Sequence, residues 1–395
     1  ASRQAVVVGA GLAGASVAAA LAALGWVVTV FDRQPQPAAE ASGNPAGLFH
    51  GTLHADDGPH ARLFRAAALL AERRLRPLIE AGAVRGQIDG LLRLGDGADA
   101  LPTMRALLQR QRLPADYVQA LDRDAVSQKA GVALARPGWF YPGGGWLAPA
   151  DAVRHWLARE GVRFVGGVNV AALRQSGDGW QVLGADGTVL ADTAALVLAN
   201  AGDAERLLAP LGQQPWALRR TRGQVSGWQG MPTPLRLPVA GDGYALPWGD
   251  GLLCGATVAA GDDEPALRDA DHHHNFERLQ RLTGLSAPAD GAAWSGRVGW
   301  RLAADDRLPL VGAVPLPPAQ CDPKSRRDQV RWLARWPGLY VASALGARGI
   351  TLAPLLGELL AARIAGLPLP LEQDLVDAID PGRWAVRAAR RAKRG

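Results

Sequence analysis

Residues 5–32 constrain the fold most, because they combine a short apolar run, a glycine-rich turn and a helix-forming run. Residues 6–8 predict a buried strand, and Gly9, Gly11 and Gly14 follow it with the G-x-G-x-x-G spacing. This spacing lets the chain turn sharply, lets its backbone approach a pyrophosphate, and lets the next helix pack closely on the sheet. A phosphate is favoured at the start of that helix, because unpaired N–H groups and the helix dipole both attract negative charge.

A second apolar strand is predicted over residues 26–31 and ends at Asp32, eighteen residues after Gly14. A carboxylate at this point can accept hydrogen bonds from both ribose hydroxyls. It also repels a ribose phosphate, which disfavours NADP. Strand, glycines, helix, strand and acid in register therefore predict that the chain binds an adenine dinucleotide.

The same apolar stretch follows Arg3 and could be interpreted as a signal peptide or a membrane span. Its glycine spacing and the charged end of its second strand argue against both. No other apolar run reaches the ~18 residues that a spanning helix needs. Cys254 and Cys321 are too far apart in sequence for a disulfide framework or a metal-ligand cluster. We therefore expect a soluble, cytoplasmic protein without membrane contact.

Three consecutive histidines, residues 272–274, resemble a cluster of metal ligands. Successive residues of a helix point in different directions, and no second cluster supports these three. We expect them on a solvated helix face and expect no bound metal.

The length of 395 residues and the apolar content of 48% predict a large core and two or three domains. Strands are predicted at residues 162–170 and 189–200, in the nucleotide-binding sheet, and at residues 219–227, 241–247 and 252–259, in a second, more antiparallel sheet. Helices are predicted at residues 61–79 and 350–364, the second after a strand at residues 338–343. The nucleotide-binding domain is therefore expected to be discontinuous in sequence.

A second glycine-rich turn, residues 344–351, joins the last predicted strand to the last predicted long helix. It is either a close packing turn or a second anion site. Beside an isoalloxazine ring, the positive end of such a helix would stabilise the negative charge that develops on reduction. A dinucleotide held from both ends of a chain is more typical of flavin than of nicotinamide.

Several further motifs occur in the order found in the D-amino-acid-oxidase-like flavin superfamily. They are Ser-Gly-Asn at residues 42–44, Tyr-Pro-Gly-Gly-Gly-Trp-Leu at 141–147, Arg-Gly-Gln-Val at 222–225, Asp-Gly-Tyr at 242–244, a Gly-Trp-Arg segment opening residues 299–312, and Gly-Ala-Arg-Gly at 346–349. In detail the chain resembles the FAD-dependent C-terminal oxidoreductase half of the MnmC family, the bifunctional enzymes that modify the tRNA wobble uridine. The resemblance extends over residues 6–387.

The resemblance implies an α/β fold: a Rossmann-like FAD-binding domain with an inserted, mainly antiparallel α+β substrate domain. The expected boundaries are residues 1–85, 142–215 and 296–366 for the FAD-binding domain, 86–141 and 216–295 for the substrate domain, and 367–395 for a basic C-terminal tail. It also implies non-covalent FAD, because no Cys or His stands in a segment that resembles a flavin-attachment site.

The implied reaction is oxidation of a secondary amine. Carboxymethylaminomethyl-uridine of tRNA would lose its carboxymethyl group as glyoxylate and become aminomethyl-uridine. The family's second half, an S-adenosylmethionine-dependent methyltransferase, has no counterpart in this sequence. We therefore expect either an excised half or a separate methyltransferase partner.

The resemblance also implies the site residues. For FAD binding these are Gly9, Gly11, Gly14, Asp32, Ser42, Asn44, Gly47, Val168, Ala199, Gly202, Arg301, Gly346, Arg348, Gly349 and Ile350. Arg301, Arg348 and Tyr244 are the candidates for the catalytic site, since a substrate carboxylate calls for an arginine fork. Trp146, Gln224 and Tyr244 are expected to line the substrate.

The net charge of +6 concentrates at the end of the chain, where residues 383–394 form a basic amphipathic stretch. This stretch either grips the phosphate backbone of tRNA or is only a solvated terminus. Two other functions stay open. One is a small-molecule oxidase of glycine, sarcosine or D-amino acids. The other is a binding protein whose flavin is structural and which docks tRNA or the methyltransferase.

Overall fold

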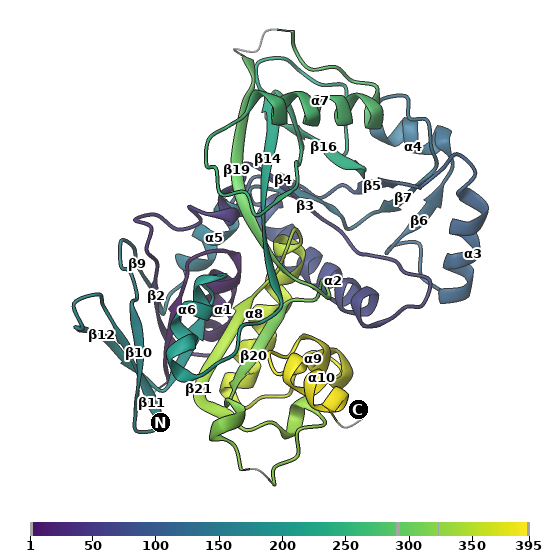
Figure 1. Cartoon of the computed structure of the whole chain (residues 1–395). Helices are drawn as coiled ribbons and strands as arrows, with labels where there is room; N and C mark the ends of the chain where they lie inside the picture. Colours follow the sequence, from purple (N-terminus) through teal and green to yellow (C-terminus); the bar gives the residue numbers. More distant parts are fainter. Residues whose placement is uncertain (1–2, 290–292, 323, 393–395) are drawn as a thin grey trace. The chain divides into compact units, whose positions relative to one another are not determined.

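The computed structural model describes residues 3–289, 293–322 and 324–392 (Figure 1). The contacts divide the chain into two units. The first unit comprises the described parts of Ala1–Gly43, Ala150–Arg220 and Arg301–Gly395, and the second comprises those of Asn44–Pro149 and Thr221–Trp300. The chain thus crosses between the units four times.

A six-stranded, mostly parallel sheet forms the centre of the first unit. In spatial order its strands are β20 (Leu310–Pro315), β21 (Arg335–Ser343), β13 (Ala195–Leu198), β1 (Gln4–Val8), β2 (Val27–Phe31) and β9 (Val162–Val165), of which only β20 is antiparallel to its neighbour. All of β13 is buried, as is β1 from its second residue on, which fits a parallel sheet that is covered on both faces.

Two apolar helices, α1 (Leu12–Ala23) and α8 (Gly349–Ala365), pack against each other in this unit. Their close approach depends on Gly357, because a Cβ there would lie 2.7 Å from the carbonyl oxygen of Ser16. The unit also contains α5 (Pro149–Leu157), whose first residue belongs to the second unit, and α6 (Asp203–Leu208). None of the described helices is long and apolar enough to cross a membrane.

The strand expected at residues 189–200 is two strands in different sheets. β12 (Val189–Thr193) pairs in a small antiparallel sheet with β11 (Gly179–Leu183), which pairs in turn with β10 (Ala172–Ser176), whereas β13 joins the central sheet. Thr193 interrupts the run, because its hydroxyl accepts from Ala195 N (3.2 Å) and donates to Ala195 O (2.9 Å). The expectation of a single strand was therefore wrong.

The second unit contains a large, mainly antiparallel sheet. Its strands are β18 (Ala259–Ala260), β14 (Leu218–Trp228), β17 (Gly251–Gly255), β16 (Gly243–Trp248), β15 (Val239–Gly241), β5 (Leu91–Leu94), β7 (Gly138–Tyr141) and β6 (Gln119–Leu121), with β19 (Ser295–Ala304) pairing to β14. The first three residues of β14 and the last four of β19 belong to the first unit. A three-stranded sheet is formed by β3 (Gly47–Phe49), β8 (Gly145–Leu147) and β4 (Gly86–Gln87). The helices are α2 (Pro59–Glu80), α3 (Leu101–Gln111), α4 (Arg123–Ala130) and α7 (Asp269–Thr283).

The units differ from the expected domains mainly at residues 44–85 and 142–149, which were expected in the FAD-binding domain. They group with the second unit because β3 pairs with β8, and β8 with β4.

Helix α7 carries the three histidines, and here the expectation of a solvated face was only partly right. His273 and His274 are exposed, but His272 is buried beside Phe276 and Trp294. Loss of solvent around the ring lowers the pKa of His272. Among the described residues, no group of three potential ligands could hold a metal ion.

The C-terminal region was expected to be a basic tail, but its described part folds onto the first unit as α9 (Gln373–Ile379) and α10 (Arg383–Ala392). Arg383 is buried and donates from Nε and Nη2 to the Asp306 carboxylate at 2.9 and 3.0 Å. Arg387 binds the same carboxylate at 2.8 Å. The stretch is thus more than a solvated terminus, and its first two arginines are engaged by Asp306 and hold the helix in place.

We predict that Asp306→Asn lowers the free energy of unfolding by about 3 kcal/mol at pH 7, because it leaves a buried guanidinium without its counter-charge. The matched control Asp328→Asn, in an exposed pair with Arg326, should cost less than about 1 kcal/mol. Urea unfolding of the variants measures both values. An equal loss of unfolding free energy in both variants would contradict the conclusion that Asp306 is the counter-charge of a buried arginine.

The pH dependence gives a second readout of this pair. Burial opposes ionisation of Asp306, but the hydrogen bonds and charge of Arg383 outweigh it and lower the pKa of the carboxyl. A carboxyl group whose pKa is lower in the folded than in the unfolded protein stabilises the fold at pH values above the unfolded-state pKa. This contribution is lost as the pH falls through the pKa of the folded state. The difference in free energy of unfolding between wild type and Asp306→Asn should therefore become smaller below about pH 4.

Candidate active site

Two of the three glycines of the G-x-G-x-x-G motif, at the turn between β1 and α1, cannot be replaced by a larger residue without a clash. Gly9 has φ +106°, and a Cβ there would lie 2.6 Å from the carbonyl oxygen of Ala199. A Cβ on Gly14 would collide with the carbonyl oxygen of Gly9. At Gly11 a Cβ would lie 3.0 Å from Ser42 Oγ, a tight but less severe contact. The turn is thus a cradle of bare backbone that any larger residue would fill.

Two side chains fix the backbone N–H groups of this turn. Asp32 accepts from Ala10 N at 2.6 Å through Oδ2 and from Gln34 N at 2.8 Å through Oδ1. Ser42 Oγ accepts from Leu12 N, the first residue of α1, at 2.9 Å. Sequence reasoning expected Asp32 to bind ribose but missed that it holds the turn. Each carboxylate oxygen accepts more than one hydrogen bond, so the two roles are compatible.

The neighbouring strand ends complete this edge of the sheet. Val168 N donates to the carbonyl oxygen of Asp32 at 2.9 Å, and Ala199 N donates to that of Val8 at 2.8 Å. Ala201, just after β13, has φ +53°, and Gly202 follows it as the residue before α6. In open α/β sheets ligands bind at the carboxyl ends of the strands, which is where these residues lie.

Three buried polar atoms at the same edge have no hydrogen-bond partner among the residues that the structure describes. They are Asn200 Oδ1 after β13, Ser343 Oγ at the end of β21, and Thr351 Oγ1 in the first turn of α8. A buried polar group without a partner costs about 1–3 kcal/mol, so such atoms point to a ligand that would satisfy them. Together with the glycine cradle, they fit a dinucleotide with its hydroxyl and phosphate groups.

The glycine-rich turn before α8 lies beside the end of β19. Gly346 N donates to the carbonyl oxygen of Leu302 at 2.9 Å, and Leu345 forms a bridge with Ala303. The backbones that carry Arg301 and Arg348 are therefore adjacent, and both residues are half-buried. Gly349 and Ile350 begin α8, where a Cβ on Gly349 would lie 3.0 Å from Leu12 Cδ1 of α1. This brings the beginnings of α1 and α8 to one site.

The second unit contains the other expected site residues. Trp146 and Tyr244 are half-buried and pack against one apolar cluster, which consists of Ala46, Val225, Leu246 and Leu253. Trp146 Nε1 donates to Gln87 Oε1 at 3.2 Å. Gly47 opens β3 opposite Leu147, and Asn44 precedes it by three residues. Two aromatic side chains at the edge of one cluster offer an apolar surface with polar tips, which suits a substrate lining.

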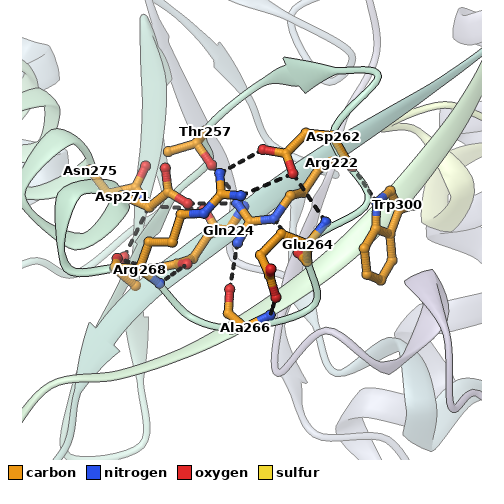
Figure 2. Close-up of polar contacts among 11 residues, drawn as sticks. Arg222, Gln224, Thr257, Asp262, Glu264, Ala266, Arg268, Asp271, Asn275 and Trp300 are labelled. Carbon is orange, nitrogen blue, oxygen red and sulfur yellow. Dashed lines mark hydrogen bonds and ion pairs between the residues drawn. The ribbon is translucent and has the colours of Figure 1, made fainter.

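Gln224 has a different place from the one expected. Its side chain is fully buried in the second unit, where Oε1 accepts from Arg268 N and Nε2 donates to Arg268 O, both at 2.9 Å (Figure 2). Both ends of the amide are thus occupied by backbone. The expectation that Gln224 lines the substrate is corrected: it positions the segment that begins after β18.

Arg222, two residues earlier on β14, completes this anchor and was missed as a functional residue. Its buried guanidinium donates to Asp271 Oδ2 at 2.6 Å and to the carbonyl oxygens of Glu264 and Ala266 at 2.7 Å each (Figure 2). Arg268 is paired with Asp262 at 2.6 and 3.0 Å. Residues 262–268 are thereby anchored to β14 through backbone and side-chain hydrogen bonds.

A sequence signal for this anchor exists. Arg222, Gln224 and Ser226 alternate in a strand, and side chains two residues apart share a face. All three are buried, so this is a polar face inside the unit rather than a solvent face.

These features define an α/β dinucleotide-binding protein. The chain belongs to the FAD dependent oxidoreductase family, whose model matches residues 4–363. It is an FAD-dependent oxidoreductase, which confirms the prediction of a flavin rather than a nicotinamide cofactor.

Curated relatives align with this sequence along nearly its whole length. It is 49% identical over 398 residues to the tRNA 5-methylaminomethyl-2-thiouridine biosynthesis bifunctional protein MnmC of Methylibium petroleiphilum, which covers 98% of this chain and 61% of that protein. The protein of the same name from Burkholderia orbicola is 41% identical, covering 100% of this chain and 62% of its own length. The chain thus spans about three-fifths of these relatives. The expected resemblance is confirmed.

Solved structures confirm the fold. Glycine oxidase from Bacillus cereus superimposes with a TM-score of 0.75 at 21% identity, covering 95% of this chain and 97% of that one. L-proline dehydrogenase from P. horikoshii also has a TM-score of 0.75, at 16% identity and with 97% and 98% coverage.

We predict that Gly14→Ala yields protein that has lost most of its FAD, because the added methyl group would strike the Gly9 carbonyl oxygen and deform the cradle. Gly97→Ala is the matched control, since nothing lies within 4 Å of its Cβ position. The ratio of visible flavin absorbance to protein absorbance measures occupancy. A Gly14→Ala protein as yellow as wild type would refute the placement of the dinucleotide at this turn.

Proposed function

We propose that this chain oxidises carboxymethylaminomethyl-uridine at the wobble position of tRNA, releasing the carboxymethyl group as glyoxylate and leaving aminomethyl-uridine. The observation that carries the proposal is 49% identity over 98% of the chain to a protein named for tRNA 5-methylaminomethyl-2-thiouridine biosynthesis. Two further observations support it. One is the cofactor edge of the first unit, which is the carboxyl edge of its sheet with the glycine-rich turn, and the other is the half-buried pair Trp146 and Tyr244 of the second unit.

The chemistry needs few protein groups. A hydride leaves the methylene carbon that lies between the amine nitrogen and the carboxylate, and the nitrogen lone pair forms a C=N bond to this carbon. Water then adds to the same carbon, and its bond to nitrogen breaks. The products are glyoxylate and a primary amine. Bound FAD supplies the two-electron acceptor. The protein must therefore position the methylene group and leave the amine lone pair available, rather than supply a strong base.

We propose that arginine binds the substrate carboxylate, because a planar guanidinium matches it with two parallel hydrogen bonds. Arg301 and Arg348 are the candidates: their backbones are joined through the Leu302–Gly346 hydrogen bond, and each is half-buried. Tyr244 and Trp146 are proposed to line the uridine side of the substrate.

The proposed FAD contacts follow from the edge described above. In the first unit they are Gly9, Gly11, Gly14, Asp32, Ser42, Val168, Ala199, Gly202, Arg301, Gly346, Arg348, Gly349 and Ile350; Asn44 and Gly47 would add contacts from the second. We propose that FAD is held without a covalent bond.

The relatives' names describe bifunctional proteins, and the chain spans about three-fifths of their length. We propose that methylation from S-adenosylmethionine is performed by a methyltransferase that is either the rest of a longer protein or a separate partner. A tRNA substrate places the proposed reaction in the cytoplasm.

We expect anaerobic mixing with tRNA that carries carboxymethylaminomethyl-uridine to bleach the visible flavin absorbance, with one glyoxylate formed per flavin reduced. Mass spectrometry of the nucleosides should show the matching aminomethyl-uridine. Free glycine, sarcosine and D-amino acids should leave the flavin oxidised. Bleaching by these amines but not by tRNA would instead indicate a small-molecule oxidase, and a flavin that nothing reduces would indicate a binding protein.

We also predict that Arg301→Ala keeps its flavin spectrum but loses kcat/KM on tRNA by an amount equivalent to about 2–5 kcal/mol, the cost of leaving a buried carboxylate unpaired. Arg301→Lys should recover only part of this, because an ammonium lacks the planar fork. Arg174→Ala, an exposed arginine of β10, controls for loss of charge. Turnover of Arg301→Ala equal to that of this control would reject the role.

A further inference from the structure

We propose that the first unit contains an RNA-binding surface formed by α10 and the adjacent segment before β21. This surface, the α10 surface, consists of Arg326, Arg331, Trp332, Arg390 and Arg391, all of which are exposed. It would bind the phosphate backbone through its cations and stack an unpaired base on Trp332. The inference rests on the proposed tRNA substrate, and it concerns where that RNA is held.

Specific contacts join the parts of this surface. Arg390 Nε, on α10, donates to the carbonyl oxygen of Asp328 at 2.9 Å. Arg331 binds Asp377 of α9 at 2.9 Å. Helices α9 and α10 lie side by side at the C-terminal end of the chain (Figure 1). Residues distant in sequence therefore present their charges on one face.

The two halves of α10 have different tasks. Arg383 and Arg387 are both bound to Asp306, and Arg383 is buried, so they attach the helix to the unit. Arg390 and Arg391, one turn further on, are exposed. Residues 383–392 include no acidic side chain that would neutralise them. The end of the helix is thus a fixed source of positive charge.

The acidic partners on this surface hold their arginines only weakly. Arg326 pairs with Asp328 at 3.3 Å, with the two side chains 61% and 37% exposed. The Arg331–Asp377 pair is also largely solvated on the arginine side. Exposed pairs of this kind contribute little to stability, and a phosphate can replace the carboxylate.

Trp332 adds a feature that a purely electrostatic patch would lack. It is 48% exposed, whereas the other tryptophans in the described ranges are buried or half-buried. The Arg326 guanidinium lies 5.0 Å from the centre of its ring. An indole with an arginine stacked on it offers a flat, cationic platform for a splayed base, the usual way in which proteins hold single-stranded RNA. An unpaired base beside a phosphate backbone is what an anticodon loop supplies.

Binding of a fluorescent tRNA by full-length flavin-loaded protein, measured from about 50 to 200 mM salt, tests the surface. Arg390→Ala combined with Arg391→Ala should reduce the slope of log Kd against log salt by about 2, one for each phosphate that the variant no longer neutralises. Trp332→Ala should raise Kd about tenfold without changing the slope, since stacking releases no counterions. Trp332→Phe should restore most of the affinity.

Arg163→Ala combined with Arg174→Ala is the matched control. It removes the same charge from exposed positions of the first unit that lie on β9 and β10 and not on α10. It should change the slope little. If the control and the α10 variant have equal slopes and Trp332→Ala binds as wild type does, the inference is overturned.

Turnover separates the two proposals. Wild type that binds tRNA with the expected variant pattern but leaves its flavin oxidised would refute the proposed function and support the surface. Wild type that oxidises tRNA while the α10 variants bind normally would refute the surface alone. Unchanged flavin spectra confirm that the variants are folded.

Discussion

The first unit depends on backbone approaches that a side chain would prevent. At Gly9 the chain passes within contact distance of the Ala199 carbonyl group, which seats β1 beside β13, and at Gly357 helix α8 reaches the backbone of α1 at Ser16. Both contacts join segments that the sequence of the second unit separates. Close backbone packing therefore determines where these segments meet. It leaves a glycine-rich turn before α1, in which Asp32 and Ser42 accept hydrogen bonds from Ala10 N and Leu12 N. The cofactor edge is a consequence of the way this unit is closed.

Much of this arrangement could be predicted from local patterns. The glycine spacing, the apolar runs and Asp32 act over a few residues, so their effect on the backbone needs no knowledge of the rest of the fold. The same holds for the turn before α8. β1, β2 and α8 accordingly begin and end within two residues of their expected limits. The family membership and the fold shared with glycine oxidase agree with what these patterns indicated.

The remaining features depend on contacts between distant residues. His272 looks like its exposed neighbours in the sequence, and contacts such as those with Phe276 and Trp294 bury it. Arg383 belongs to a run of similar arginines, and its burial depends on Asp306, which is 77 residues away in sequence. Gln224 is an ordinary polar residue until the backbone of Arg268 occupies its amide. A pattern of residue types contains no information about which of several like residues a distant partner will select.

The anchor at Arg222 has an evolutionary consequence. Its guanidinium holds the segment after β18 through the carbonyl oxygens of Glu264 and Ala266, and every amino acid has a carbonyl oxygen. Exposed positions of this segment can therefore mutate to other residue types while their path through space is retained. Such an anchor keeps the backbone path of a surface segment while its outer side chains vary. One buried arginine thus separates the inheritance of loop shape from the inheritance of loop chemistry.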